Sequence, residues 1–521
     1  MRIEESQGST GQQNGHAQPA KPPPTAEQIL GEIREFCRET QTAESTFGRL
    51  VVNDGKLVSR LRDGARITTG TLDKVRAYLS EHRPASAAAR SEPSPSAKPA
   101  NGAAHAVAPP GFRFFDNRQK YLLFVSTCSE KTEVGNRISL ELGNLQPAPP
   151  ALRIFDAGVG DGTVLSRVMR AVHARFPTMP LYVVAKEISY EDVRLMLEKM
   201  ADRLFEHPAT VLVVTNLYYA EAPWLTPRSV TSAQGLIWKD VTLSGNTAHG
   251  FAEQIGELEG FLAENWRAGI SPTTGNPVYQ RPVILTLRRE DHSFLLDPIM
   301  PRPGRVMADY DLVIASQPYR ARASVEFKAS KVVTPLVKSL RPGGRLIGIH
   351  SHGNDPGIEI IDQVWPGDDP FKTDRYAILR QVKHELGAAA RHYNFNASSD
   401  ARSIFRYHMH TLPDEVSGPI GTSTLFAAWN AAIYVAQIED NRLSEVVRDG
   451  RYLEATDRVL KKHGGLWFND ETYVISRRRA PASRGDGRDR LRSGIRQARR
   501  AAAVRVGRNL LARTSDCGTA R

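Results

Sequence analysis

The residues with the clearest chemical potential lie in one glycine-rich stretch, Asp156-Ala157-Gly158-Val159-Gly160-Asp161-Gly162-Thr163. Glycine lets the backbone turn sharply and approach a ligand closely, because it carries no Cβ atom. The stretch follows a short apolar segment, residues 152–155, and precedes a segment whose apolar residues recur at helical spacing. A glycine loop between a strand and a helix indicates a site for a nucleotide-like cofactor.

Polar side chains also follow the next two predicted strands. Glu187 comes after the second strand, residues 181–185, where a carboxylate can accept the hydroxyl protons of a ribose. Asn216 comes after the third strand, residues 210–215, where its side chain could meet the edge of an adenine. A polar residue in that position is also common as a turn former.

A second substrate is expected beside the cofactor, beyond the carboxyl end of the fourth strand. That strand, residues 311–315, runs directly into Ser316-Gln317-Pro318-Tyr319. A serine oxygen and a backbone carbonyl could accept the hydrogens of an amine while the tyrosine ring stacks on its base. The same residue types would also make a plain strand-to-turn exit. His350, at the end of the fifth strand, is the candidate general base for a hydroxyl acceptor.

These positions together make up the predicted site. Cofactor contacts are expected from Asp156, Gly158, Gly160, Gly162, Glu187 and Asn216. Catalytic contacts are expected from Ser316, Tyr319 and His350. Histidines alternate in two pairs, His350 with His352 and His408 with His410. No carboxylate or cysteine spacing converges with these pairs, so no metal site is predicted.

Apolar strands alternate with amphipathic helices between the glycine loop and His350. Strands that are apolar on both faces are typical of a parallel sheet covered by helices on both sides. A late strand at residues 472–475 is expected to add an antiparallel edge. The predicted fold class is α/β, a Rossmann-like, doubly wound and mostly parallel sheet.

The stretch from Ile154 to His350 resembles the class I S-adenosylmethionine-dependent methyltransferases. The letters FDAGVGDGT match the first motif of that family, AKEIS supplies the acid of the second, and LRPGGRLIGIH resembles the helix-turn-strand before the fifth strand. The resemblance implies that S-adenosyl-L-methionine is the cofactor. It also implies that Asp156 and the loop of residues 158–162 face its methionine part, and that Glu187 holds the ribose.

The loop after the fourth strand resembles a motif within that family. Methyltransferases of exocyclic amino groups carry [D/N/S]-P-P-[Y/F/W] there, and S-Q-P-Y is similar. Gln317 stands where those enzymes usually have proline, which predicts a looser loop.

Composition divides the chain into several segments. Pro, Ala and Ser dominate the residues before Gly111, which predicts a semi-extended linker there. The predicted segments are a disordered start at 1–25, a helical module at 26–82, a linker at 83–110, a methyltransferase domain at 111–476 with an insertion at about 216–310, and a disordered basic tail at 477–521.

The helical module is predicted to form a small all-α N-terminal domain, and it resembles the lambda-repressor-like helix-turn-helix domains. That resemblance implies that Lys56, Ser59, Arg60 and Arg62 face the major groove of DNA. A helical module used for docking or dimerisation is the alternative.

The charge of +12 is concentrated in the tail. Residues 477–521 contain 14 Arg and three Asp, a net of +11, which leaves the other 476 residues at about +1. A near-neutral body lacks the basic surface that duplex binding needs. The favoured function is therefore methylation of a small molecule at N or O. The alternatives are methylation of an exocyclic amino group in nucleic acid, and a non-enzymatic DNA-binding regulator that senses the cofactor.

Several features predict a cytoplasmic protein without membrane contact. No run of 18 apolar residues is present, and the first 24 residues lack the apolar core of a signal peptide. Cys37, Cys128 and Cys517 are far apart, which fits a reducing compartment.

Overall fold

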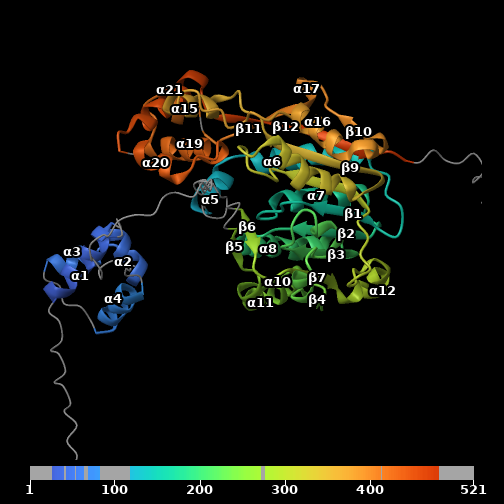
Figure 1. The fold of residues 1–521 in the computed structure, drawn as a ribbon, viewed down its shortest axis with the longest axis horizontal. Coiled ribbons are helices and arrows are strands. Elements are labelled where there is room, and N and C mark those ends of the chain that lie inside the picture. Colours follow the sequence, from blue (N-terminus) through green and yellow to red (C-terminus); the bar gives the residue numbers. More distant parts are fainter. Residues whose placement is uncertain are drawn as a thin grey trace, which may run out of the picture. The chain divides into compact units, whose positions relative to one another are not determined.

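The computed structural model describes the following residues: 26–39, 43–52, 54–63, 69–81, 118–271, 276–411, 413–446 and 448–479. The chain divides into two units, Met1–Ala104 and His105–Arg521 (Figure 1). The predictions for the start at 1–25, for the linker at 83–110 and for the tail beyond Arg479 fall outside the described residues.

The first unit is helical over its described residues. Its helices are α1 (Ala26–Glu39), α2 (Glu44–Val52), α3 (Leu57–Arg62) and α4 (Thr69–Glu81). Phe36, Phe47 and Tyr78 pack edge-to-face at its centre. Leu57, Val58, Leu61 and Val75 join this core, as their helical spacing predicted.

Ten of the described strands form the sheet of the second unit. In spatial order these are β10 (Tyr393–Asn396), β12 (Trp467–Arg477), β9 (Leu340–Ser351), β8 (Tyr310–Ser316), β1 (Leu152–Asp156), β2 (Leu181–Lys186), β3 (Thr210–Thr215), β7 (Val283–Arg289) and β4 (Ile237–Leu243), with β11 (Ile404–His408) also on β12. Strands β3, β2, β1, β8 and β9 run parallel, and β12 lies antiparallel to β9. The predicted α/β fold with a late antiparallel strand is confirmed.

Helices cover both faces of this sheet. On one face, α6 (Glu130–Ser139), α7 (Thr163–Arg175) and α8 (Tyr190–Glu206) pack on residues such as Ile154, Ile314 and Ile349. On the other face, α14 (Thr334–Lys338) and α16 (Arg375–Leu386) pack on residues such as Phe155 and Val313. Because side chains alternate along a strand, the face of each site residue follows from its neighbours.

The predicted insertion at about 216–310 partly extends the sheet. Strand β7 pairs antiparallel with β3, and β4 pairs parallel with β7. The rest of the insertion contains α9 (Val230–Gln234), α10 (Ala248–Gly256), α11 (Glu259–Asn265), the hairpin of β5 (Ala268–Ile270) and β6 (Pro277–Tyr279), and α12 (Ser293–Leu296). The sequence did not predict this extension of the sheet.

A cluster of helices drawn in orange and red, with α5 beside it, forms a separate apolar core within the second unit (Figure 1). Its helices are α5 (Arg118–Thr127), α15 (Pro356–Val364), α19 (Thr422–Val435), α20 (Asp440–Val446) and α21 (Arg451–His463). The short helices elsewhere in this unit are α13 (Val325–Phe327), α17 (Asp400–Ser403) and α18 (Pro413–Ser417). Asn430 of α19 donates its amide to the Lys120 carbonyl at 3.0 Å, which fixes α5 against this cluster.

The predicted tail begins inside the sheet. Arg477 is the last residue of β12, and its guanidinium donates to the Leu340 carbonyl at 2.7 Å. The Arg478 backbone N–H donates to the His392 carbonyl at 2.8 Å. The first arginines of the basic segment therefore belong to the folded sheet.

Within the described part of the chain, we find no helix with the length and apolar character needed to cross a membrane.

Candidate cofactor and acceptor site

The glycine loop joins β1 to α7 at the carboxyl edge of the sheet. Gly160 and Gly162 have φ values of +53° and +77°, in the left-handed region that side chains rarely adopt. A Cβ atom at Gly162 would lie 2.6 Å from Met196 Cγ and 2.9 Å from Met196 Cα. Gly158 differs, because its φ is not positive and a Cβ atom there would meet open space. Gly162 is thus required by the fold, whereas Gly158 leaves room for a ligand.

Asp156 lies at the base of this loop and is 2% exposed. Its Oδ1 accepts the Gly158 N–H at 3.4 Å. Burial raises the pKa of Asp156 to about 7, and the nearby charge of Glu187 adds to the rise. The position of Asp156 on the face of Ile154 aims it toward α7 and α8.

Glu187 follows β2, and its carboxylate joins the loop after β2 to the glycine loop after β1. Its Oε2 accepts the Gly160 N–H at 3.0 Å, and its Oε1 accepts the N–H groups of Ile188 at 2.7 Å and Ser189 at 3.0 Å. A carboxylate has about four acceptor positions, so one is left for a hydroxyl proton. The sequence predicted that Glu187 holds a ribose through two hydroxyls; this geometry offers a single free acceptor position.

Asn216 has a structural role that the sequence did not predict. It is 1% exposed, its amide donates to the Arg281 carbonyl at 2.8 Å, and its oxygen accepts the Val283 N–H at 2.8 Å. These bonds fix the start of β7 beside β3. The structure therefore does not present this side chain to an adenine.

Asp161, within the glycine loop, is held from three sides. The Tyr121 hydroxyl of α5 donates to its Oδ1 at 3.1 Å, the Thr163 hydroxyl donates to its Oδ2 at 2.5 Å, and Lys199 lies 3.3 Å from its Oδ2. Burial alone would raise the pKa of Asp161, but the charge of Lys131 and the bond from Thr163 outweigh it and lower that pKa. Helix α5 is thereby attached to the cofactor loop.

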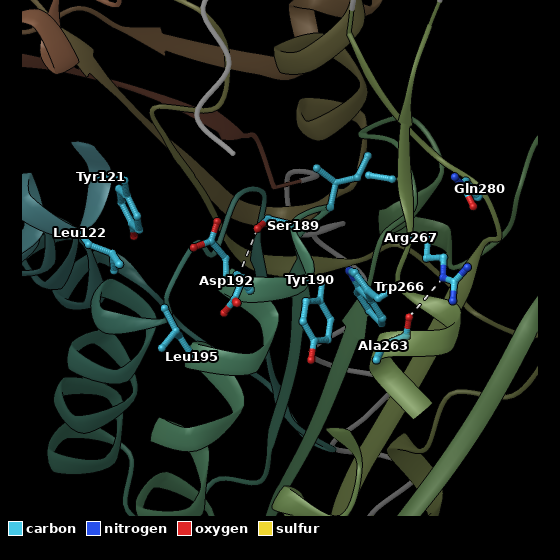
Figure 2. Close-up of a pocket in the computed structure, with 13 residues that line it drawn as sticks. Tyr121, Leu122, Ser189, Tyr190, Asp192, Leu195, Ala263, Trp266, Arg267 and Gln280 are labelled. Carbon is cyan, nitrogen blue, oxygen red and sulfur yellow. Dashed lines mark hydrogen bonds between the residues drawn. The ribbon is translucent and has the colours of Figure 1, made fainter. Parts of the chain in front are cut away.

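A cavity of about 460 Å³ opens at Ile188 and Ser189, the two residues that follow Glu187 in the chain. Figure 2 shows residues of α5 and α8, such as Tyr121 and Leu195, at its left and insertion residues at its right. Its lining residues are Tyr121, Leu122, Ile188, Ser189, Tyr190, Glu191, Asp192, Leu195, Ala263, Trp266, Arg267, Ala268 and Gln280. The Trp266 indole N–H donates to the Glu187 carbonyl at 3.1 Å, so the insertion closes one side of the cavity. Burial raises the pKa of Asp192 in this wall to about 7, with the Glu187 charge adding to the rise.

The residues predicted to hold the acceptor lie on both faces of the sheet. Ser316 ends β8 on the face of Ile314 and Asp156, and it is partly exposed. Tyr319 and His350 instead pack into the opposite face, with exposures of 6% and 4%. Their rings meet edge-on at 5.9 Å, and the Tyr319 hydroxyl lies 3.4 Å from that of Tyr473. The structure therefore places Ser316 near the cofactor loop and separates Tyr319 and His350 from it.

Gln317 does not loosen the loop, and that prediction is wrong. Its backbone N–H donates to the Ile349 carbonyl at 2.8 Å, and its side-chain amide donates to Ser351 Oγ and Asp470 Oδ1, each at 3.2 Å. Its φ is +46°, which proline cannot adopt because the ring fixes φ near −65°. This loop is firmly tied, and its backbone differs from that of a loop with proline at this position.

We expect Gln317→Pro to destabilise the second unit by about 2 kcal/mol or more, because it forces φ out of the left-handed region and removes the N–H bond to Ile349. Gln317→Gly keeps the backbone conformation and loses only the side-chain bonds, so its loss should be smaller. Urea unfolding of both variants measures the difference. Equal midpoints for wild type and Gln317→Pro would contradict the observed loop geometry.

His350 belongs to a buried ionic cluster that the sequence did not reveal. Its Nε2 lies 2.9 Å from Oε1 of Glu471, which is 0% exposed, and Arg375 Nη1 donates to Oε2 at 2.8 Å. His352 Nδ1 lies 3.7 Å from the same carboxylate. Burial lowers the pKa of His350, which keeps its ring neutral. In the sequence, the alternation of His350 and His352 along the chain was the one feature that suggested a shared partner for the two rings.

Comparison of this chain with known proteins finds no matching family model and no matching curated protein. Among solved structures, it is similar to a geranyl diphosphate methyltransferase in complex with its substrate and sinefungin, at 11% identity over 66% of this chain and 77% of that one, with a TM-score of 0.25. It is also similar to PKMT2 from Rickettsia typhi in complex with AdoHcy, at 11% identity over 67% of this chain and 54% of that one, with a TM-score of 0.22. These identities and scores are too low to bear on the chemistry of this chain.

Proposed function

We propose that the second unit is an S-adenosyl-L-methionine-dependent methyltransferase. The observation that carries this proposal is the bond from Gly160 to the Glu187 carboxylate, which joins the glycine loop to the acid after β2. The 460 Å³ cavity begins at the next residue, Ile188. Nucleoside cofactors bind at this carboxyl edge of doubly wound sheets. The cavity wall supplies the apolar and aromatic surface that an adenosine needs, from Ile188, Tyr190 and Trp266.

The chain's own residues would bind and orient the reactants. When bound, the cofactor supplies a methyl group already activated by its sulfonium sulfur. Glu187 accepts a ribose hydroxyl proton, and the open space at Gly158 admits the methionine part close to the backbone. Trp266 and Tyr121 line the cavity and would pack on the bound cofactor.

Calorimetry with S-adenosyl-L-methionine and with S-adenosylhomocysteine tests this proposal. Glu187→Gln should weaken binding at least about tenfold, because a charge-assisted hydrogen bond is lost and the tie to Gly160 is disturbed. Glu198→Gln, on the exposed side of α8, is the matched control and should bind like wild type. If neither ligand binds the wild-type protein, the proposal fails.

For the acceptor, a small molecule methylated at N or O remains our proposal over an amino group in nucleic acid. The left-handed Gln317 gives the loop after β8 a backbone that the proline-containing motif cannot share at that position. The body of the chain is also close to neutral. Ser316 and Gln317 lie on the acceptor side of the glycine loop in this proposal.

For the first unit, we retain weak DNA contact by a helix-turn-helix-like module as a proposal. Lys56, Ser59, Arg60 and Arg62 are exposed along α3. Arg60 pairs with Asp54 and Arg62 pairs with Glu44, which reduces the free positive charge of this surface.

We expect residues 26–82, made alone, to bind a DNA duplex weakly and with strong salt dependence, because exposed cations supply sequence-independent attraction to phosphates. Gel shifts over a salt series measure this. Lys56→Ala should weaken binding, whereas Lys74→Ala, an exposed lysine on α4, serves as the comparison. Absence of binding at low salt would favour a docking module.

A further inference from the structure

Two buried carboxyl groups each have one oxygen without a hydrogen-bond partner among the described residues, and one of the two groups contacts the acceptor loop. Asp470 of β12 is 0% exposed and Glu130 at the start of α6 is 4% exposed. Asp470 Oδ1 accepts the Gln317 amide at 3.2 Å, but its Oδ2 has no hydrogen-bond partner among the described residues. Glu130 Oε2 has only the ammonium group of Lys131 near it, at 3.1 Å. Buried carboxyl oxygens are normally hydrogen-bonded, so an unpartnered one needs an explanation.

These acids are on the same side of the sheet as the cofactor loop. Asp470 alternates with Val474 on the face of Ile347 and Ile349, which Asp156 and Ser316 share. Lys131 lies 5.7 Å from the centre of the Tyr121 ring, and Tyr121 lines the cavity and bonds to Asp161. Asp470 is thus in direct contact with the acceptor loop, and Glu130 is connected to the cavity wall through Lys131 and Tyr121.

The charges of this region do not balance. Burial raises the pKa of Asp470 well above its usual range, and the charges of Glu130 and Asp355 raise it further. A hydrogen bond with Ser351 and the charge of Lys131 oppose this rise, but Lys131 is already paired with Glu130. A cation that reached Oδ2 would both satisfy the oxygen and favour the ionised carboxylate.

We propose that Asp470, assisted by Glu130, receives a positively charged nitrogen of the methyl acceptor, so that the acceptor is an amine or a guanidine. This inference rests on the proposed methyltransferase function and names its substrate class. A hydroxyl acceptor would leave the second acid without a partner. A cationic nitrogen at Asp470 Oδ2 instead gives that oxygen a charge-assisted hydrogen bond, and the nearby charge of Glu130 attracts the same cation.

The proton transfers balance as follows. Asp470 releases its proton to solvent when the cationic acceptor binds, and the carboxylate then takes one proton from the acceptor nitrogen. The freed lone pair forms the N–C bond to the methyl carbon, and the C–S bond breaks with its electron pair passing to the sulfonium sulfur. The methylated nitrogen then carries the positive charge, and the sulfur leaves as a neutral thioether.

The test measures binding of small cations without requiring turnover. n-Butylammonium and methylguanidinium are the probes, 1-butanol is the neutral control, and melting temperature is the readout with S-adenosylhomocysteine present. A ligand that binds only the folded state raises the melting temperature with its concentration. At least one cation should stabilise wild type, and 1-butanol should not.

Variants identify the site. Asp470→Asn keeps the shape of the side chain and should weaken the cation at least tenfold, and Glu130→Gln should weaken it also. Glu253→Gln, an exposed acid on α10, should bind the cation like wild type. Binding of S-adenosylhomocysteine by each variant shows that its cofactor site is folded.

Each result decides between distinct conclusions. If S-adenosylhomocysteine binds but neither cation does, the acids do not receive the acceptor and only this inference fails. If the cations bind only when S-adenosylhomocysteine is absent, the acids hold the ammonium of the cofactor's methionine part, and the inference is overturned. If S-adenosylhomocysteine itself does not bind, the proposed function fails and this inference fails with it.

Discussion

Alanine at Gly158 should weaken cofactor binding about tenfold or more and leave the melting temperature unchanged, whereas alanine at Gly162 should destabilise the second unit. At Gly158 the new methyl group enters open space, so the fold accepts it and only an approaching ligand meets it. At Gly162 the methyl group meets Met196 Cα at 2.9 Å and the backbone has a φ of +77°. Left-handed strain of this kind costs about 1–3 kcal/mol.

Thermal unfolding and calorimetry with S-adenosylhomocysteine, applied to both variants, separate the two effects. The pair is matched because the same methyl group is added four residues apart in one loop. Equal cofactor affinity in Gly158→Ala and wild type would show that the ligand does not approach the loop there. Unchanged stability of Gly162→Ala would contradict the observed packing of the loop against α8.

Arg375→Met should destabilise the protein by about 3–5 kcal/mol, the usual cost of removing one partner from a buried ion pair. Arg375 is 1% exposed, and its guanidinium and backbone N–H both donate to the fully buried Glu471. Removal of the guanidinium takes away the permanent positive charge beside that carboxylate and leaves the His350 ring at 2.9 Å and the His352 ring at 3.7 Å. Urea unfolding measures the loss, and the double variant Arg375→Met with Glu471→Gln should recover part of it, because the buried charge is then gone.

The dependence of the free energy of unfolding on pH, at acid pH, gives an independent check on this cluster. Burial alone would raise the pKa of Glu471, but the bonds from His350 and Arg375 outweigh it and lower that pKa to about 2, from an ordinary 4.5. A lowered carboxyl pKa contributes stability that is complete above the unfolded value and is lost as pH falls from about 4.5 through about 2. Arg375→Met should lose less stability over that range than wild type does. If both proteins lose the same free energy of unfolding over that pH range, the result would argue against the pairing of Arg375 with Glu471.

The sequence predicted the central sheet well because its strands are apolar on both faces. Strands β2 and β3 are buried at every position, so neither a surface strand nor an amphipathic helix fits their pattern. The loop from Asp156 to Gly162 was also recognisable, since Gly160 and Gly162 have the left-handed backbone conformation that favours glycine. Glu187 was singled out because it directly follows the second apolar strand, whereas its bond to Gly160 was not predicted.

Other parts of the site depend on contacts that no local pattern contains. Asn216 was expected at an adenine, yet its amide bonds to the backbone of Arg281 and Val283, 65 and 67 residues further along the chain. Asp470 meets Gln317 across 153 residues, and its neighbour Glu471 faces the opposite side of the sheet toward His350. Sequence spacing gave no sign that consecutive acids on one strand serve two separate clusters.

Strand β12 also determines when the site can exist during synthesis. It lies between β9 and β10, so the edge of β9 stays unpaired until residues 467–477 have left the ribosome. Asp470, which bonds to Gln317, and Glu471, which pairs with Arg375, both belong to those eleven residues. A nascent chain that already contains the whole glycine loop therefore still exposes an open sheet edge and two unpaired polar clusters. We expect the ability to bind the cofactor and the ability to bind the acceptor to appear together, late in translation, rather than in the order in which the site residues are made.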